Sequence, residues 1–512
     1  SSSTPLTALT KEPLTKTSHE QINTCQKVTR LLQPYHEKLT ELDNEEVDNV
    51  MSDTSSFTSP AKSQQFIHDF VLLYKSLHLS YCIKHLVKPL PSPYISLDAS
   101  RPWMIYWLMH SVSLMGMEWD ESVSDEHGAM PESVLQFRKF LDEKFQVNLA
   151  ELRQDMIDSL RAHQKDTGGF AGGTECQISH LAPTYAAINA LITLGTREAY
   201  ELINRDSLRT FLLSLKVDGG RGGVRMHHGG EIDVRGVYCL LSCAALSGIL
   251  DEEIMSGLDD YVLACQTHEG GIAAYPGCEA HGGYTFCGLA AMMILKKQHR
   301  LDLDSLTLWN ARRQMTEEGG FQGRTNKLVD ACYSFWVGGA FPLIEGSLAS
   351  RKFQITQRDW HVYEQLQWRP ANVERQERVE ESKIDVGDKM ENVAQTTSIR
   401  FEDLDETPPQ KRRTRGLPTE EHIFNQEALQ EYLLLCCQSV NGGLIDKPGR
   451  GPDFYHTCYA LSGLSIAQHN PSGTPSILGN PSNILQETNP IFNVLRTKAE
   501  KALMHWYGKN HL

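Results

Sequence analysis

An aspartate, a cysteine and a distant histidine are the residues whose types most clearly allow metal chemistry. Asp330 and Cys332 are separated by one residue, and His456 lies far downstream. Carboxylate, thiolate and imidazole are donors that Zn²⁺ binds, and three protein ligands leave a fourth position open. Residues at i and i+2 of a helix do not share a face, so we expect Asp330 just before a helix and Cys332 in its first turn. The same residues also fit a helix N-cap and a buried core thiol.

A second group of residues could bind an anion. Arg324 and Lys327 precede Asp330 in the stretch GRTNKLVDACY, and Tyr333 follows it. Arginine and lysine together suit phosphate oxygens. With His281 they would lie near helix N-termini, whose free N–H groups and dipoles favour anions. A diphosphate there would place a leaving group beside a metal-held thiolate. An exposed basic pair with no ligand is the alternative interpretation.

Aromatic side chains recur in the apolar stretches of the sequence. Each one is consistent with ordinary core packing, but together they would line a deep apolar cavity. These residues are Trp103, Trp107, Tyr238, Tyr284, Trp336 and Tyr455.

A repeat of about fifty residues must position these groups. Its markers are a glycine pair and, after an irregular segment, a tyrosine that opens an apolar stretch rich in small residues. The glycine pairs are Gly168-Gly169, Gly219-Gly220, Gly270-Gly271, Gly319-Gly320 and Gly442-Gly443. The tyrosines are Tyr185, Tyr238, Tyr284, Tyr333 and Tyr459.

Each repeat predicts two helices. The first is amphipathic and ends at the glycine pair, where glycine can adopt the left-handed C-cap conformation. The second is apolar nearly all round and should be buried. The predicted fold is therefore all-α, an α/α barrel of about six helix-hairpin repeats with parallel inner helices around a central cavity, or an open solenoid. We expect the residues three positions before each tyrosine to be equivalent. They are Ala182, Arg235, His281, Asp330 and His456.

The last tyrosine spacing is too long, and the excess falls on a charged, weakly periodic stretch. We interpret this stretch, residues 346–424, as an insertion between repeats. The barrel domain is then expected at 61–345 and 425–512. Residues 1–60 are interpreted as a partly flexible N-terminal extension that holds a short amphipathic helix around Cys25–Leu42.

Composition excludes several classes of protein. The 512 residues contain 49 Lys and Arg against 64 Asp and Glu, a formal charge of −15, which argues against nucleic acid as a main partner. No apolar run reaches the roughly 20 residues of a membrane span, and the first residues show no apolar signal core. Twelve cysteines are too few for a disulfide scaffold of this length. We therefore expect a cytoplasmic protein with free thiols.

Several long motifs resemble one known family. They are LDASRPWMIYW, HLAPTYAAINAL, GGEIDVRGVYC, GCEAHGGYTFCGLAA, GGFQGRTNKLVDACYSFW and GGLIDKPGRGPDFYHTCYALSGLSIAQH. The chain resembles the protein prenyltransferase β family, in particular its farnesyltransferase branch, over about 65–345 and 425–510. The resemblance implies an α/α barrel that pairs with a crescent-shaped helical-repeat α subunit.

The resemblance also implies an activity. Asp330, Cys332 and His456 would bind Zn²⁺, and the cysteine of a C-terminal C-a-a-X box, as in small GTPases, would take the open position. Its thiolate would attack farnesyl diphosphate, and Asp446 would hold Mg²⁺ at the diphosphate.

The resemblance assigns further residues to three pockets. The implied diphosphate site is His281, Arg324, Lys327 and Tyr333. The implied isoprenoid wall is Arg235, Tyr238, Tyr284, Cys287, Trp336, Trp103 and Tyr459. The implied peptide pocket is Trp103, Trp107 and Tyr455, with His180, Ala182 and Pro183 around its last residue.

Three alternatives are open. A type I geranylgeranyltransferase β subunit is the nearest, but Trp103 and Tyr459 are bulky residues of the farnesyl type, and Asp446 stands where the type I enzyme has lysine. A triterpene cyclase shares a related barrel, but its DxDD protonation motif is missing here. A barrel that only binds proteins, without catalysis, is the third.

Overall fold

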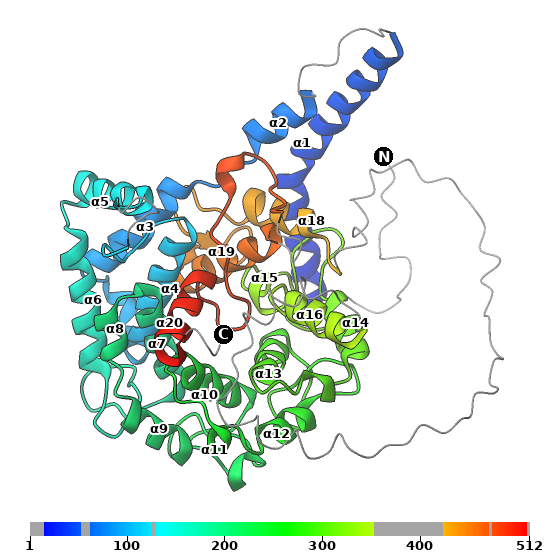
Figure 1. Cartoon of the computed structure of the whole chain (residues 1–512). Coiled ribbons are helices and arrows are strands. Elements are labelled where there is room, and N and C mark those ends of the chain that lie inside the picture. Colours follow the sequence, from blue (N-terminus) through cyan, green and yellow to red (C-terminus); the bar gives the residue numbers. More distant parts are fainter. Residues whose placement is uncertain (1–14, 53–61, 124–128, 353–422, 470–473, 509–512) are drawn as a thin grey trace, which may run out of the picture.

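Six inner helices form a closed ring in the computed structural model, which describes residues 15–52, 62–123, 129–352, 423–469 and 474–508. Each helix packs against the next, and α19 returns to α4 (Figure 1). The predicted α/α barrel is confirmed, and the open solenoid is excluded by this closure. The inner helices are α4 (Arg101–Leu114), α7 (Leu181–Leu194), α10 (Val234–Leu246), α13 (Gly282–Ile294), α15 (Tyr333–Trp336) and α19 (Phe454–Gln468).

An outer layer of helices surrounds this ring (Figure 1). Its main members are α3 (Lys75–Val87), α6 (Leu149–His163), α9 (Arg205–Ser214), α12 (Leu258–Cys265), α14 (Leu303–Ala311) and α18 (Gln426–Glu431), which continues into the π turn η6 (Tyr432–Cys436). Further helices and turns between them are α5 (Glu132–Phe145), α8 (Arg197–Glu201), α11 (Glu252–Met255), α16 (Ala340–Lys352), η2 (Ser92–Ser100), η3 (Asp218–Gly220), η4 (Gln298–Arg300) and η7 (Pro481–Asn483).

The two layers follow from the hydrophobic pattern. Every residue of α7 except Ala182 is buried, as expected for a helix that is apolar all round. In α9 the buried residues are Leu208, Phe211 and Leu212, which lie on one face at i, i+3 and i+4. The difference assigns α7 to the inside of the barrel and α9 to its half-buried outer layer.

The glycine pairs do not cap the outer helices, so that expectation is wrong. The C-cap of α6 is Gln164, and Gly168 lies in the turn beyond it. A Cβ on Gly168 would lie 2.0 Å from the Ser207 carbonyl oxygen in the first turn of α9, and the φ of Gly168 is +89°. Glycine is required here because the turn is left-handed and because the next outer helix approaches closely. Gly442 closes the ring in the same way against Leu77 of α3.

A glutamine just beyond the end of an outer helix forms side-chain hydrogen bonds to the backbone at the start of the next outer helix. Gln438 shows the pattern: its Nε2 donates to the Leu72 carbonyl at 2.8 Å, and its Oε1 accepts from the Tyr74 N–H at 2.9 Å. Because residues 438 and 74 belong to the last and first repeats, this contact joins the two ends of the ring. The other members are Gln164, Gln266 and Gln314.

The inner helices begin at the same end of the barrel, called the mouth here. Three of them donate their first N–H to a loop carbonyl of the following repeat, as in Gly282 to the Gly323 oxygen at 2.7 Å. Ala331, two residues before α15, donates to the Asp446 carbonyl oxygen in the same way at 2.8 Å. The N-cap residues His180, Asp233, His281 and Asp453 each accept a backbone N–H group of the first turn with their side chains. Asp330 holds the equivalent place before α15, where its side chain accepts the N–H group of Cys332, the N-cap.

The predicted equivalence between repeats is therefore correct only for His281 and Asp330. Ala182 and Arg235 lie two residues after their caps, and His456 lies three residues after Asp453. The prediction counted back from the tyrosines, but the tyrosines lie at different distances from the starts of their inner helices, although each opens an apolar stretch.

A C-terminal segment enters the barrel from the end opposite the mouth. The Tyr106, Tyr185 and Tyr238 hydroxyls donate to the carbonyls of Asn493, Phe492 and Ile491 at 2.5, 3.1 and 2.7 Å. Helix α20 (Arg496–Tyr507) follows the segment and packs on α7 and α10. The segment Asn489–Val494, called the plug here, therefore forms the floor of the barrel interior.

Helix α1 (Lys16–Ser52) projects from the barrel together with α2 (Lys62–Phe70), as Figure 1 shows. It is longer than the predicted helix Cys25–Leu42. Its residues Val28, Leu32, Tyr35 and Leu39 are buried, and α1 packs against α2 and η6. At least this part of the N-terminal extension is therefore attached to the barrel. Most of the expected insertion 346–424 lies outside the described residues.

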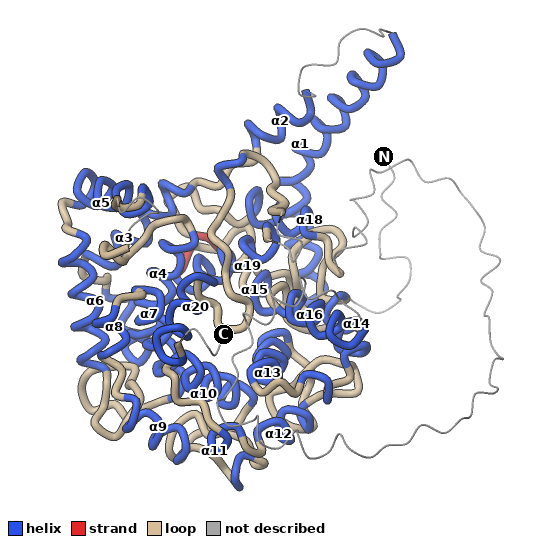
Figure 2. The backbone as a smooth tube through the Cα atoms, in the orientation of Figure 1, coloured by secondary structure: helices blue, strands red, loops and turns tan. Residues whose placement is uncertain are grey.

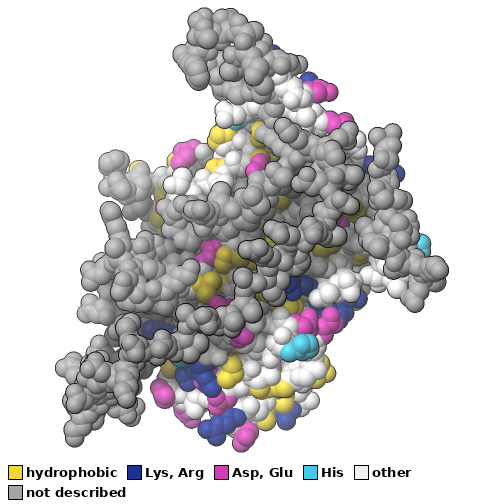
Figure 3. Space-filling model, turned by 90° about the vertical axis from the view of Figure 1, so that its right-hand side faces the viewer, with side chains coloured by type: hydrophobic (Ala, Val, Ile, Leu, Met, Phe, Trp, Pro, Cys, Tyr) yellow, Lys and Arg dark blue, Asp and Glu magenta, His cyan; other side chains and the backbone are white. Residues whose placement is uncertain are grey.

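The surface carries charges of both signs side by side. On the face shown in Figure 3, Lys and Arg side chains lie among Asp and Glu where the surface is not grey. Surface charges also form ion pairs, such as that between Arg209 and Asp251. A helix able to cross a bilayer is absent from the described residues.

Candidate metal centre and substrate cavity

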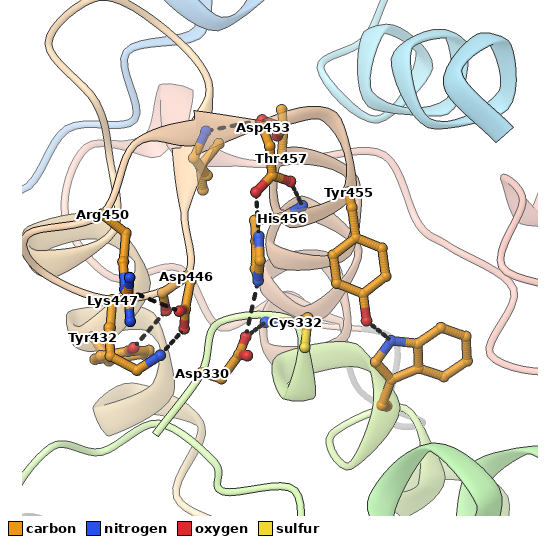
Figure 4. Close-up of polar contacts among 12 residues, drawn as sticks. Asp330, Cys332, Tyr432, Asp446, Lys447, Arg450, Asp453, Tyr455, His456 and Thr457 are labelled. Atoms are coloured by element: carbon orange, nitrogen blue, oxygen red, sulfur yellow. Dashed lines mark hydrogen bonds and ion pairs between the residues drawn. The ribbon is translucent and has the colours of Figure 1, made fainter. Parts of the chain in front are cut away.

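Asp330, Cys332 and His456 meet at the mouth, between α15 and α19 (Figure 4). Their possible ligand atoms all lie within 4.8 Å of one another. Asp330 Oδ1 accepts the Cys332 N–H at 2.8 Å and lies 3.3 Å from His456 Nε2. Asp330 thus precedes α15, as the i, i+2 spacing predicts, whereas Cys332 is the N-cap of α15 and not a residue of its first turn.

Close packing of two helices creates this meeting. A Cβ on Gly463 of α19 would lie 2.2 Å from the Cβ of Ser334 in α15, so glycine lets the helices approach. The short antiparallel strands β1 (Leu444–Ile445) and β2 (Pro452–Asp453), red in Figure 2, precede α19 and place Asp453 at its N-cap. This tertiary contact helps to bring together Cys332 and His456, which lie far apart in the sequence.

Two carboxylates fix the His456 ring. Its Nδ1 lies 2.6 Å from Asp453 Oδ2, and its Nε2 faces Asp330. Burial disfavours the charged ring, but the hydrogen bonds with Asp330 and Asp453 outweigh it and raise the pKa of His456 to about 9. A proton therefore stands on the atom that a metal ion would take.

The donor set fits Zn²⁺. Burial and the nearby Asp330 raise the pKa of the Cys332 thiol well above its usual value, so without a metal the thiol keeps its proton. A zinc ion would replace the protons of Cys332 and His456 Nε2 and relieve the crowding of Asp330. Asp453 holds the remaining ring nitrogen, the arrangement that orients metal-binding histidines.

Asp446 lies to one side of His456, opposite Tyr455 (Figure 4). Its carboxylate contacts the Lys447 ammonium and lies 3.9 Å from Arg450 Nε. Burial and the negative charge of Asp330 raise the pKa of Asp446. One carboxylate paired with two cations does not make a Mg²⁺ site by itself, because Mg²⁺ needs further oxygen ligands.

His281 and Tyr333 form the centre of the predicted anion group. Tyr333 Oη lies 3.0 Å from His281 Nε2, and a Cβ on Gly323 would fall 2.1 Å from the Tyr333 ring. Burial lowers the pKa of His281, and the positive charge of Arg324 lowers it further. Arg324 is ion-paired with Glu279. Lys327 is exposed, and no contact of its ammonium joins it to this group within the described residues.

A continuous aromatic wall runs from the metal centre into the barrel. Trp336 Nε1 donates to Tyr455 Oη at 2.9 Å, and the Trp336 ring lies 4.5 Å from that of Tyr459. Tyr455 then contacts Trp107, which lies against Trp103. These are five of the predicted isoprenoid and peptide residues.

The remaining predicted wall residues lie around α10 and α13. Tyr284 lies beside His281, with 5.4 Å between ring centroids, and Cys287 is buried one turn later in α13. Tyr238 is buried and donates to the plug. Arg235 is engaged by Asp233 and Glu231, which makes it a paired cation at the mouth.

The residues predicted for the end of the peptide line a cavity of about 500 Å³. Trp103, His180, Ala182 and Pro183 all contribute to it. Of this set, His180 is the N-cap of α7, with Nδ1 accepting the Ala182 N–H at 3.1 Å.

Sequence reasoning missed several polar residues of the site. Asp453 is the clearest, because an aspartate three residues before His456 at a helix start is an N-cap signal. Lys447 and Arg450 follow Asp446 closely but carry no pattern that predicts their ion pairs. His227, which lines the cavity near His180, belongs to a loop without a recognisable motif.

Comparison with known proteins identifies the family of this chain. Residues 73–494 match the model of the prenyltransferase alpha-alpha toroid domain. A protein farnesyltransferase subunit beta of Pisum sativum is 40% identical over 415 residues, 78% of this chain and 88% of that protein. A geranylgeranyl transferase type-1 subunit beta of Arabidopsis thaliana is 37% identical, but over 35% of this chain and 51% of that protein.

A solved structure shares the fold. Candida albicans protein geranylgeranyltransferase-I complexed with GGPP aligns with a TM-score of 0.52 and 19% identity, over 85% of this chain and 99% of that one. The sequence match to farnesyltransferase subunits is the more extensive of the two subunit matches. The match to the family model, residues 73–494, includes the helices that hold the metal centre. The chain therefore belongs to the prenyltransferase α/α toroid family, among the protein farnesyltransferase β subunits.

Proposed function

We propose that this chain is the catalytic β subunit of a cytoplasmic protein farnesyltransferase, which transfers a farnesyl group from farnesyl diphosphate to the cysteine of a C-terminal C-a-a-X box. The observation that carries the proposal is the convergence of Asp330, Cys332 and His456 beside an aromatic-walled barrel. The family membership gives the reaction class. The twelve cysteines all lie in described residues and are free, which supports a reducing compartment.

Asp330, Cys332 and His456 would hold Zn²⁺, with Asp453 orienting the His456 ring. When bound, the ion supplies an open coordination position at which a substrate thiol loses its proton near neutral pH. The chain's own contribution is to keep Cys332 buried and His456 fixed, so that the three donors stay aimed at one point.

The group of His281, Tyr333 and Arg324 would receive the diphosphate, with exposed Lys327 free to turn toward it. Neutral His281 accepts the Gly283 N–H at Nδ1, so its proton is on Nε2. Nε2–H can donate to the Tyr333 hydroxyl, whose own proton is then free to donate toward the mouth. Donors placed before the reaction stabilise the charge that grows on the leaving diphosphate. Arg324 can exchange its exposed partner Glu279 for phosphate oxygens.

The barrel interior would hold the isoprenoid chain against Trp336, Tyr238, Tyr284, Cys287 and the depth-limiting side chains of Trp103 and Tyr459. Tyr459 is 1% exposed and packed on Trp336, so it cannot turn aside to admit a longer chain without repacking. Trp103 lies against Trp107 and Tyr185. This supports farnesyl over geranylgeranyl diphosphate.

Mg²⁺ would require the diphosphate itself to supply most of its ligands, because Asp446 offers one carboxylate that Lys447 already contacts.

A helical-repeat α subunit is the expected partner. Trp107, Tyr455 and the cavity by His180, Ala182 and Pro183 would receive the a-a-X residues of the peptide.

The test is turnover by this chain co-expressed with an α subunit. We expect about one zinc per complex and a clear preference for farnesyl over geranylgeranyl diphosphate with a C-a-a-X peptide. Preference for the longer chain would show a type I geranylgeranyltransferase instead. Folded complex without zinc and without turnover would show a barrel that only binds proteins.

A further inference from the structure

The cavity beside α7 is walled by two loops as well as by helix residues. One loop, Cys176–Ile178, precedes α7, and the other contains His227 and precedes α10. The His227 ring centroid lies 5.1 Å from that of His180, with 38° between the ring planes. Two imidazoles therefore share one cavity of about 500 Å³ with Trp103 and Pro183.

The backbone fixes the proton of His180. The Ala182 N–H donates to its Nδ1 at 3.1 Å, so that nitrogen is an acceptor and the proton of the neutral ring is on Nε2. Burial lowers the pKa of His180, nearby His227 and Arg235 lower it further, and the negative charge of Glu231 opposes them only in part. His180 is therefore neutral near pH 7 and offers one N–H donor at Nε2.

The backbone fixes His227 in the opposite sense. Its Nδ1 lies 3.0 Å from the His228 carbonyl oxygen, which can only accept, so Nδ1 carries the proton and Nε2 is an acceptor in the neutral ring. A Cβ on Gly230 would lie 2.6 Å from this ring, so the turn leaves it little freedom. Among the described residues, neither Nε2 atom has a hydrogen-bond partner.

Given the proposed function, we propose that His227 is a specificity-determining residue that, with His180, reads the side chain of the substrate's last residue. One donor and one acceptor on two rings whose centroids lie 5.1 Å apart complement a primary amide, which offers one acceptor and one donor in return. The pair therefore favours a terminal glutamine over methionine, which has similar length but no donor. A site that hydrogen-bonds a substrate group discriminates against analogues that lack it.

The experiment uses the zinc-loaded complex of the full chain with an α subunit, farnesyl diphosphate, and two peptides that differ only in ending in Gln or Met. The measured quantity is the ratio of kcat/KM for the two peptides. H227F keeps a flat ring but removes the acceptor, and we expect it to lower the Gln/Met ratio about tenfold. H227Q returns an acceptor near the Nε2 position and should restore at least half of the lost ratio.

H228F is the matched control, because His228 is exposed and contacts Ser214 rather than the cavity. It should leave the ratio within twofold of the unaltered complex. A ratio from one preparation cancels any loss of folded enzyme, so a merely structural role of His227 would lower both rates equally. That outcome, or an unchanged ratio in H227F, overturns the inference while the proposed function stands. Failure of the unaltered complex to farnesylate either peptide overturns both.

Discussion

The mouth of the barrel holds a half-buried histidine and the opposite end a fully buried one, and the two rings have opposite electrostatic surroundings. At the mouth, two carboxylates outweigh burial and raise the pKa of His456 to about 9. At the other end, His110 of α4 is fully buried and stacks on Tyr106, with 13° between ring planes. Burial lowers the pKa of His110 to about 3. At pH 7 His456 is charged and His110 is neutral.

The difference separates a region able to exchange ligands from one that holds the fold. The polar groups of the mouth face other side chains, as His456 faces Asp330 and Asp453, and a metal ion can replace the protons of Cys332 and His456 Nε2. The polar groups of the other end face the backbone of the plug, as when Tyr238 donates to the Ile491 carbonyl at 2.7 Å. Backbone carbonyls cannot leave, so the plug end stays closed.

The largest contrast should come from removing a proposed metal ligand. We expect Cys332→Ala to lose its zinc and to lower kcat/KM by at least about a thousandfold, because the substrate thiol then has no ion to lower its pKa. Zinc content and turnover are measured together. Cys458→Ala, which removes a buried thiol from α19 close to His456, is the control and should keep both. Full activity of Cys332→Ala would disprove the metal assignment.

A smaller effect is expected from the anion group. Tyr333→Phe removes the hydroxyl that meets His281 Nε2 at 3.0 Å but keeps the ring against Gly323. We expect kcat to fall about tenfold to a hundredfold with KM for the peptide little changed, because the lost donor acts on the leaving group. Single-turnover rates measure this. A rise in KM alone would place Tyr333 in binding instead.

The two histidines should also respond to pH in opposite directions. For His110 the folded-state pKa is below the unfolded value of about 6.5, so its contribution is present above pH 6.5 and is lost as the pH falls toward 3, at up to about 1.4 kcal/mol per pH unit. For His456 in the zinc-free protein the folded-state pKa is raised, so its contribution is present below pH 6.5 and is lost as the pH rises toward 9.

Thermal unfolding of the zinc-free complex across pH 4.5–9 measures both slopes. His110→Phe should flatten the acid side and leave the alkaline side unchanged, and His456→Gln should do the reverse. If both variants changed the same side, the opposed environments of the two rings would be refuted.

The smallest effect should come from loosening the plug. Asn489 is 1% exposed, and its Oδ1 accepts the N–H groups of Ile491 and Phe492 at 2.9 and 3.2 Å. We expect Asn489→Ala to cost about 1–3 kcal/mol and to lower the Tm by a few degrees. Zinc content should stay the same, because the metal centre is at the other end. Loss of zinc in this variant would mean that the two ends are not independent.

Some of this could be predicted from local patterns. The repeat length, the apolar inner helices and the position of Asp330 just before a helix all depend on the order of neighbouring residues, which hydrophobic periodicity reports directly. The long motifs added the barrel fold and the grouping of Asp330, Cys332 and His456. The Asp453 cap was also visible in principle, since it lies three residues before His456.

The remaining features depend on contacts between segments far apart in the chain. Gly463 against Ser334 brings the metal ligands together, Gln438 joins the last repeat to the first, and the plug meets the tyrosines across hundreds of residues. The same is true of His227 beside His180. Such pairs leave no periodic signal, because closure of the ring, rather than any local preference, decides which loop faces which helix start.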